Sequence, residues 1–231
     1  MEEKAGKKFV PGFPDDAVQD YEKESRKAAL EVAEGGMVLL ENDETLPLQK
    51  GAKVALFGRG AVVTEKGGTG SGDVNSRSVP SLWEGLEQAG VTVANREMLA
   101  QYRDRYQKAK EAWRSLVWEQ AKEGNSESDP FMGFIRAFEA HPFQAPAFPK
   151  AQSKEADVAF YVLSRISGEG RDREAEKGDY YLSDAEEEEL AQVCRLYPKV
   201  VLVLNVGGIV DLSSLDRYPN KIGRASCRER V

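Results

Sequence analysis

Two glycine-rich segments carry the residues whose types and spacing could support chemistry. The first, Thr64–Val74, reads TEKGGTGSGDV, and the second, Ser164–Arg173, reads SRISGEGRDR. Glycines let backbone amides approach a ligand closely, so the first segment could hold a phosphate group. In the second segment Glu169 stands between two glycines, which leaves its carboxylate exposed and unobstructed. Such a carboxylate suits a general acid that must reach a leaving-group oxygen.

Each segment also has a simpler interpretation. A phosphate-binding Walker loop ends in Gly-Lys-Ser/Thr, but here Gly72 is followed by Asp73. The dinucleotide fingerprint fails as well, because Val63 occupies the position of its third glycine. The first segment could therefore be a flexible surface loop. In the second, Glu169 could be a solvated charge while Asp172 pairs with an adjacent arginine.

The sequence contains few residues that could form other kinds of site. His141 is the only histidine, so neither a histidine-based triad nor a metal cluster is expected, and no cofactor is implied. The acidic run at 186–189 is interpreted as a solvated face in the first turn of a helix, where it complements the helix dipole. The net charge of −7 gives no basic footprint for nucleic acid.

Nothing in the pattern points to a membrane or to secretion. The longest apolar stretches, at 158–163 and 200–204, are too short to span a bilayer, and the first residues contain no apolar signal-peptide core. Two cysteines, Cys194 and Cys227, could in principle pair, but the second lies in a suspect stretch of sequence. We therefore expect a cytoplasmic protein with a reduced Cys194.

The suspect stretch is the final ten residues, 222–231, which read IGRASCRERV. They show no hydrophobic period, and every codon can be matched to the translation of a common short-read sequencing adapter. We interpret them as an artefact and leave them out of the predicted fold, as one would a fusion scar. The natural polypeptide is then expected to continue differently after Lys221.

The elements that must position the two segments alternate between strands and helices. Short apolar runs predict buried strands at 53–57, 91–94, 157–163 and 199–205. Three- and four-residue spacing and start signals predict helices at 15–40, 78–89, 98–122 and 183–196. Residues 1–14 are predicted to be an arm, and the proline-rich stretch 123–150 an irregular insertion.

This alternation predicts the fold class. Strands that are apolar throughout and are separated by helices indicate a parallel sheet covered on both faces. The expected fold is therefore α/β, with a doubly wound and mainly parallel sheet. Ligands of such sheets bind beyond the carboxyl ends of the strands, which is where both glycine-rich segments lie.

Taken together, these segments resemble the α/β sandwich domain of glycoside hydrolase family 3, the family of many β-glucosidases. The matching stretches occur in family order: EGGMVLLEN (34–42) with LPL (46–48), KVALFGRGA (53–61), KGGTGSGDV (66–74), SRISGEGRDR (164–173) and KVVLVLNVGGIVDL (199–212). The resemblance implies an arm with the start of the first helix at 1–29 and a sandwich domain at 30–221. That domain is incomplete and contains the insertion at 123–150, and the suspected artefact follows it at 222–231.

The resemblance also implies a function, the hydrolysis of O-glycosidic bonds in a β-glycoside by a retaining enzyme. Its active site lies between the sandwich and a barrel domain of the same polypeptide, which is expected to follow the sandwich and to supply the aspartate nucleophile. The glutamate of the SGEGxDR motif, Glu169, is the implied acid/base. The implied substrate-binding candidates are Lys66, Thr69, Ser71, Arg165 and Asp172.

Two expectations follow for the chain as it stands. With the barrel missing it holds half an active site, so it should have no glycosidase activity alone. The alternative function is a non-catalytic sugar-binding or assembly module of the same fold, against which the intact SGEGRDR segment argues mildly.

Overall fold

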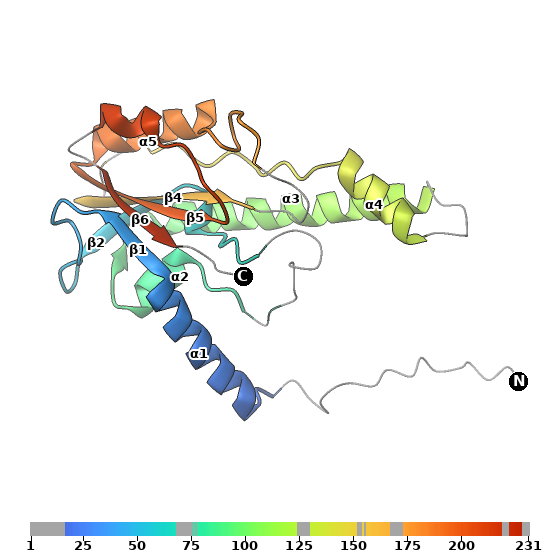
Figure 1. The fold of residues 1–231 in the computed structure, drawn as a ribbon, viewed down its shortest axis with the longest axis horizontal. Coiled ribbons are helices and arrows are strands. Elements are labelled where there is room, and N and C mark those ends of the chain that lie inside the picture. Colours follow the sequence, from blue (N-terminus) through green and yellow to red (C-terminus); the bar gives the residue numbers. More distant parts are fainter. Residues whose placement is uncertain are drawn as a thin grey trace, which may run out of the picture. The chain divides into compact units, whose positions relative to one another are not determined.

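The computed structural model describes residues 17–67, 76, 78–123, 130–151, 154, 156–166, 173–218 and 222–227. The chain divides into two units, Met1–Gly36 and Met37–Val231. Helix α1 (Asp20–Gly36) belongs to the first unit. All other elements belong to the second unit, whose ribbon is shown in Figure 1. No helix in the described part of the chain is long and apolar enough to cross a membrane.

The second unit is built on a sheet whose described strands follow the order β1-β6-β5-β4-β2-β3. Neighbouring strands pair in parallel, except that β1 is antiparallel to β6. The strands are β1 (Met37–Glu41), β2 (Lys53–Phe57), β3 (Thr92–Val93), β4 (Val158–Arg165), β5 (Lys199–Val206) and β6 (Ile222–Cys227). The two central strands β4 and β5 pair over their full length, from Val158 opposite Lys199 to Arg165 opposite Val206.

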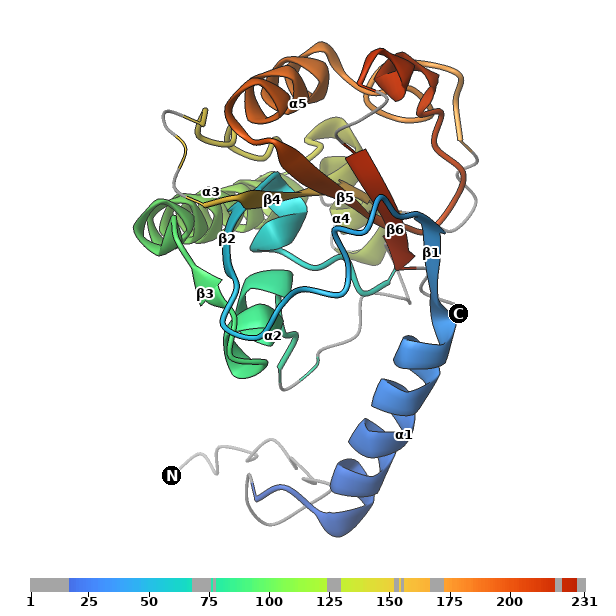
Figure 2. The same cartoon turned by 90° about the vertical axis from the view of Figure 1, so that its left-hand side faces the viewer.

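Helices cover both faces of this sheet, as Figures 1 and 2 show. Helix α5 (Asp184–Leu196) lies on one face, and α2 (Leu82–Gln88) and α3 (Arg96–Glu123) lie on the other. Residues 54–56 of β2 are completely buried between these layers. The predicted α/β fold with a doubly wound, mainly parallel sheet is thereby confirmed.

The elements with the clearest local sequence signals were predicted correctly. The strand at 53–57 is confirmed residue by residue, and the long helix at 98–122 is α3. The predicted capping box opens α5, because the Ser183 hydroxyl accepts the Glu186 N–H while the Glu186 carboxylate accepts the Ser183 N–H at 2.9 Å. These signals are local in sequence, so they require no knowledge of tertiary contacts.

Two helix boundaries differ from the prediction. The helix predicted at 15–40 ends at Gly36, and residues 37–41 form strand β1 instead. A short apolar run cannot be assigned to helix or strand from its spacing alone, and here pairing with β6 decides. Helix α2 begins after Ser81 because Ser81, which forms a capping box with Glu84, is the N-cap instead of the predicted Ser78.

The prediction of an irregular insertion at 123–150 is wrong over helix α4 (Pro130–Ala140). This helix packs against α3, and the two share a small hydrophobic cluster made of Val117, Ala121 and Ala137 with Trp113, Phe134 and Phe138 around it. Proline is tolerated in the first helical position because its missing N–H has no partner there. The prolines therefore led to a prediction of irregular structure, whereas packing against α3 stabilises a helix.

Residues 222–227, which the sequence pattern left outside the fold, form strand β6 between β1 and β5. Backbone N–H and C=O groups make these ladders, so the pairing requires no particular side chains. The origin of residues 222–231 in an adapter stays a prediction.

Candidate active site

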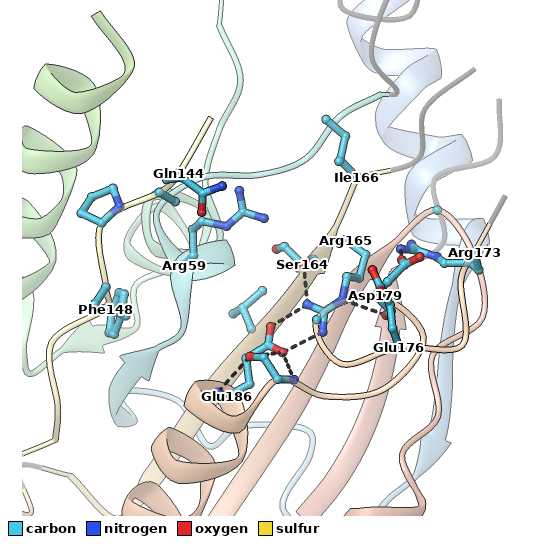
Figure 3. A pocket seen from close by; sticks show the side chains of 18 of the residues that line it. Arg59, Gln144, Phe148, Ser164, Arg165, Ile166, Arg173, Glu176, Asp179 and Glu186 are labelled. Atoms are coloured by element: carbon cyan, nitrogen blue, oxygen red, sulfur yellow. Dashed lines mark hydrogen bonds and ion pairs between the residues drawn. The ribbon is translucent and has the colours of Figure 1, made fainter. Parts of the chain in front are cut away.

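A cleft of about 1480 Å³ lies at the carboxyl edge of the sheet. Its lining includes Arg59, which follows β2, Ser164 and Arg165 at the end of β4, and Gly207 and Gly208 after β5. Figure 3 shows that Arg165, Asp179 and Arg173 gather on one side of the cleft while Gln144 and Phe148 lie on the other. This is the edge where doubly wound sheets bind their ligands.

The turn after β2 brings Arg59 to this edge. Gly58 has a φ of 80°, and a Cβ at this position would lie 2.6 Å from the Val162 carbonyl oxygen, so the close approach to β4 requires glycine. Beyond the turn, Glu65 forms an ion pair with Arg59 at 2.7 Å. The side chain of Asn205 on β5 holds the Glu65 backbone through bonds of 2.8 and 3.0 Å. The glycine-rich loop thus starts from a fixed position.

Only part of that loop is described. The Lys66 ammonium donates to the Ser76 hydroxyl at 2.9 Å, which joins the two sides of the loop. The other two candidates in it, Thr69 and Ser71, lie outside the described residues.

The Arg165 side chain is only 7% exposed and is bonded within the protein. Its guanidinium donates two parallel hydrogen bonds to the Glu186 carboxylate, at 2.5 and 2.7 Å. It also donates to the backbone carbonyls of Asp179 at 3.1 Å and Ser164 at 3.0 Å. These contacts hold the end of β4 to the start of α5 (Figure 3).

Arg173 forms the second half of this arrangement. Its guanidinium donates to one carboxylate oxygen of Asp179, and the other oxygen accepts the Glu174 N–H at 2.7 Å. We call the four side chains of Arg165, Arg173, Asp179 and Glu186 the arginine wall. Segment 167–172 runs between its two arginines and carries Glu169 and Asp172, which lie outside the described residues.

The charges of the arginine wall are compensated. Burial by itself would raise the pKa of Glu186, but the bonded Arg165 guanidinium outweighs it and holds the pKa below the ordinary value. Burial likewise acts to raise the pKa of Asp179, but the Glu174 N–H and the Arg173 guanidinium lower it overall. Both carboxylates are therefore ionised at neutral pH.

The opposite wall is mainly apolar and comes from the insertion. We call residues 142–151 the aromatic strap. The ring of Phe148, which is 8% exposed, lies 4.7 Å from the ring of Tyr102 on α3, and the Tyr102 hydroxyl donates to the Pro146 carbonyl at 3.1 Å. Ile135 and Phe138 of α4 extend this wall.

Glu189 of α5 also lines the cleft. It accepts a hydrogen bond of 2.8 Å from the Tyr161 hydroxyl, and burial raises its pKa to about 7. The interpretation of the acidic run at 186–189 as a solvated face is wrong for Glu186 and Glu189, because both carboxylates are partly buried in the cleft.

Sequence reasoning missed Asp179, Glu186 and the aromatic strap as parts of this cleft. The alternation of proline and phenylalanine in PFQAPAF (142–148) was an available signal for an ordered wall. No sequence signal indicated the pairing of Arg165 with Glu186, because the two residues are twenty-one positions apart and only the fold brings them together.

Comparison with known proteins identifies relatives for most of the chain. Residues 37–222 match the glycosyl hydrolase family 3 C-terminal domain. Curated relatives include β-glucosidase A of Butyrivibrio fibrisolvens, which is 32% identical over 91% of this chain and 26% of its own length. The β-glucosidase of Ruminococcus albus is 31% identical over 86% of this chain and 19% of its own length. The chain thus spans about a quarter or less of these relatives.

Solved structures agree with this match. Thermotoga neapolitana β-glucosidase 3B, solved in complex with glucose, superposes with a TM-score of 0.67 and 33% identity over 92% of this chain and 28% of that one. A β-glucosidase from Paenibacillus barengoltzii gives a TM-score of 0.65 at 23% identity, over 92% of this chain and 21% of that one, and shows the shared fold.

Proposed function

Because the chain belongs to glycosyl hydrolase family 3, through the C-terminal α/β domain of that family, we propose that it is part of a retaining β-glucosidase-like enzyme. The reaction is hydrolysis of an O-glycosidic bond in a β-glycoside. Glu169 is the acid/base in this proposal, and the aspartate nucleophile belongs to a barrel domain that follows in the natural polypeptide. The small share of each relative that the chain covers supports the existence of further domains.

One observation carries the proposal. The last described residue before segment 167–172, Ile166, and the first after it, Arg173, both line the cleft. Glu169 itself lies outside the described residues, so the support comes from the two flanking residues that line the cleft. The cleft itself lies where doubly wound sheets bind ligands.

The electrostatics of the cleft suit a general acid. A retaining glycosidase needs two carboxyl groups about 5–5.5 Å apart, one to attack the anomeric carbon and one to protonate the departing oxygen. An uncompensated guanidinium beside the acid would lower its pKa and leave it ionised. Here Arg59, Arg165 and Arg173 each have a carboxylate partner, so these three arginines add little net positive charge to the cleft.

The remaining candidates take different roles. Lys66, Thr69 and Ser71 border the sugar from the glycine-rich loop, and Asp172 contacts it from segment 167–172. Arg165 was also a substrate-binding candidate, but its contacts with Glu186 and two backbone carbonyls favour a role in holding that segment.

The source DNA beyond the Lys221 codon provides the first test. We expect the reading frame to continue into the rest of the sandwich and then into a barrel that contains the nucleophile. The family match ends at Ile222, where the adapter-like residues begin, which supports a different natural continuation. A frame that closes soon after Lys221, with no barrel nearby, would favour the non-catalytic sugar-binding or assembly module.

The second test replaces Glu169 by glutamine in the full-length enzyme. We expect kcat/KM to fall by about 100-fold or more for β-glucosides with poor leaving groups, because these require protonation of the leaving oxygen. Activated aryl glucosides should change far less. Glu188→Gln, a surface substitution on α5, is the matched control. Equal losses for both substrate classes would refute the acid/base assignment, and turnover of an aryl glucoside by the 231-residue chain would refute the need for a barrel.

A further inference from the structure

A row of aromatic rings leads out of the cleft along the hairpin that α3 and α4 form. Phe138 of α4 belongs to the cleft lining, and its ring lies 6.1 Å from that of Phe134, one turn earlier in the helix. The Phe134 ring in turn lies 4.8 Å from the ring of Trp118 on α3. We call these three side chains the aromatic row. Both helices run past the end of β4 in Figure 1, so the row leads from the cleft away from the sheet.

The last ring of the row is open to solvent. Trp118 is 56% exposed, whereas Trp83 is 3% exposed in the core. Trp113 is partly buried, and its indole N–H donates to the His141 carbonyl at 2.6 Å. Covering an exposed indole with the apolar face of a ligand removes a large apolar area from water. Of the three tryptophans, Trp118 is therefore the one that offers its ring to a partner.

The hairpin holds this ring on a well-packed support. Its two helices share a buried cluster to which Val117 and Ala121 of α3 and Ala137 of α4 contribute. The ring of Trp113 packs against this cluster and lies 5.5 Å from the ring of Phe143, which joins the hairpin to the aromatic strap. A side chain on a fixed support loses little conformational freedom on binding, so the contact it makes is offset by only a small ordering cost.

The surroundings of Trp118 are polar. Arg114 and Lys122 stand one turn before and one turn after it on α3, so their exposed side chains lie on the same side of the helix. Leu116 is also exposed, at 41%, but residues two positions apart on a helix do not face the same way. Trp118 is thus a single apolar ring flanked by hydrogen-bond donors, which is much less than the broad surface that a stable protein interface buries.

This combination matches the shape and polarity of a sugar ring. A β-linked glucosyl unit carries its hydroxyl groups around its edge and only C–H groups on its faces, so a flat apolar face is surrounded by a polar rim. The apolar face stacks on an indole, while guanidinium and ammonium groups donate to the hydroxyl oxygens. Because the row begins in the cleft lining, a ligand that reaches from the cleft to Trp118 along α4 is a chain of several units.

We propose that Trp118 binds a glucosyl unit of a β-linked oligosaccharide, remote from the bond that is hydrolysed, and that the α3–α4 hairpin thereby extends the cleft for longer substrates. The sugar-binding platform rests on the aromatic row, whereas its place in hydrolysis rests on the proposed function. A small aryl glucoside has no unit that reaches Trp118, so the hairpin favours oligosaccharides over such substrates.

The first test is nitrogen–proton correlation NMR of the isotope-labelled 231-residue chain, with cellotetraose as the probe. The three tryptophans give three indole N–H signals, and the one absent from Trp118→Phe belongs to Trp118. We expect this signal to shift with a Kd on the order of 1 mM, while those of Trp83 and Trp113 stay in place. A Trp118 signal that does not move at about 10 mM cellotetraose would overturn the proposal.

Variants test whether the ring itself carries the binding. By titration calorimetry, Trp118→Ala should weaken the binding of cellotetraose by about fivefold or more, because the stacking surface is lost. Leu116→Ala is the matched control, since it truncates an exposed apolar side chain on the same helix outside the aromatic row, and it should leave the Kd unchanged. Urea unfolding verifies that each variant is folded, and Trp118→Gln replaces Trp118→Ala if that variant does not fold. Equal affinities of the two variants would contradict the platform.

The full-length enzyme tests the connection to the cleft. We expect Trp118→Ala to lower the ratio of kcat/KM for cellotetraose to kcat/KM for cellobiose by about fivefold, because only the longer substrate reaches the platform. Leu116→Ala should leave this ratio as it is. A Trp118 signal that shifts in the 231-residue chain, together with an unchanged ratio in Trp118→Ala, would overturn the extension of the cleft.

The outcomes separate the inference from the function on which it rests. If Glu169→Gln discriminates between leaving groups but Trp118→Ala binds cellotetraose as Leu116→Ala does, the platform is wrong and the proposed function stands. If Glu169→Gln does not discriminate while the Trp118 signal shifts, the proposed function fails and the sugar-binding platform stands.

Discussion

The two walls of the cleft are stabilised by different interactions. The difference is visible in the pKa values of two glutamates that lie one turn apart on α5. Glu186 belongs to the arginine wall, where its carboxylate is bonded by a guanidinium that is only 7% exposed, and its pKa is lowered. Glu189 accepts a bond from the neutral Tyr161 hydroxyl, and burial raises its pKa to about 7. Burial acts in the same direction on both groups, so the bonded cation decides the sign of the shift.

The aromatic strap shows the same contrast in its packing. It is fixed by Phe148 against Tyr102, a contact that depends on shape and buried apolar area. The arginine wall instead depends on keeping each buried charge paired, because an unpaired charge in a partly buried site is costly. Substitutions on the two sides should therefore differ in their cost and in their dependence on pH.

The largest effect is expected for Glu186→Ala. It leaves the buried Arg165 guanidinium without its carboxylate and removes the side-chain half of the capping box of α5, which together should lower the free energy of unfolding by about 4 kcal/mol. Urea unfolding measures the loss. Glu188→Ala, which removes an exposed ion pair with Lys150 and a long, exposed hydrogen bond from Gln192, should change little. Equal effects of the two variants would contradict the distinction between buried and exposed pairs.

A somewhat smaller loss is expected on the other wall. Phe148→Ala removes a buried ring from its contact with Tyr102 and should lower the free energy of unfolding by about 3 kcal/mol. The control is Ile209→Ala, which truncates a side chain that is 69% exposed. If the two variants unfolded at the same urea concentration, the aromatic strap would not be packed as described.

The smallest effect is a pH dependence that comes from Glu189. Its pKa is about 7 in the folded chain and 4.5 as the ordinary value, so between these pH values the folded chain binds more protons than the unfolded chain. The free energy of unfolding should therefore fall as pH rises from 4.5 to 7, by on the order of 2 kcal/mol. Glu189→Gln should remove this dependence, which urea unfolding at a series of pH values measures.

Glu186 provides the opposite sign within the same series. Because its folded pKa is lowered, its contribution is present above its ordinary pKa and is lost as pH falls through the lowered folded value. Subtracting the Glu189→Gln profile from that of the parent chain isolates the Glu189 contribution. A difference that rises with pH would contradict the raised pKa of Glu189.

Much of the fold could be predicted from sequence because its signals are local. The strands β2, β4 and β5 are mainly apolar runs, and the spacing of Ser183 and Glu186 indicates the start of α5. The position of the cleft followed from the same reasoning, since it lies beyond the strands that precede the two glycine-rich segments. Such features depend on residues within a few positions of one another.

The sequence by itself therefore determined the mainly parallel sheet, the edge at which we propose that ligands bind and the SGEGRDR segment that carries Glu169. Only the tertiary structure decided what surrounds that segment. The bonds of Arg165 to Glu186 and Asp179, the packing of α4 on α3 and the placement of the aromatic strap join residues far apart in the chain. Burial and bonded charges follow from those contacts, and they decide which carboxylate has a lowered pKa and which has a raised one.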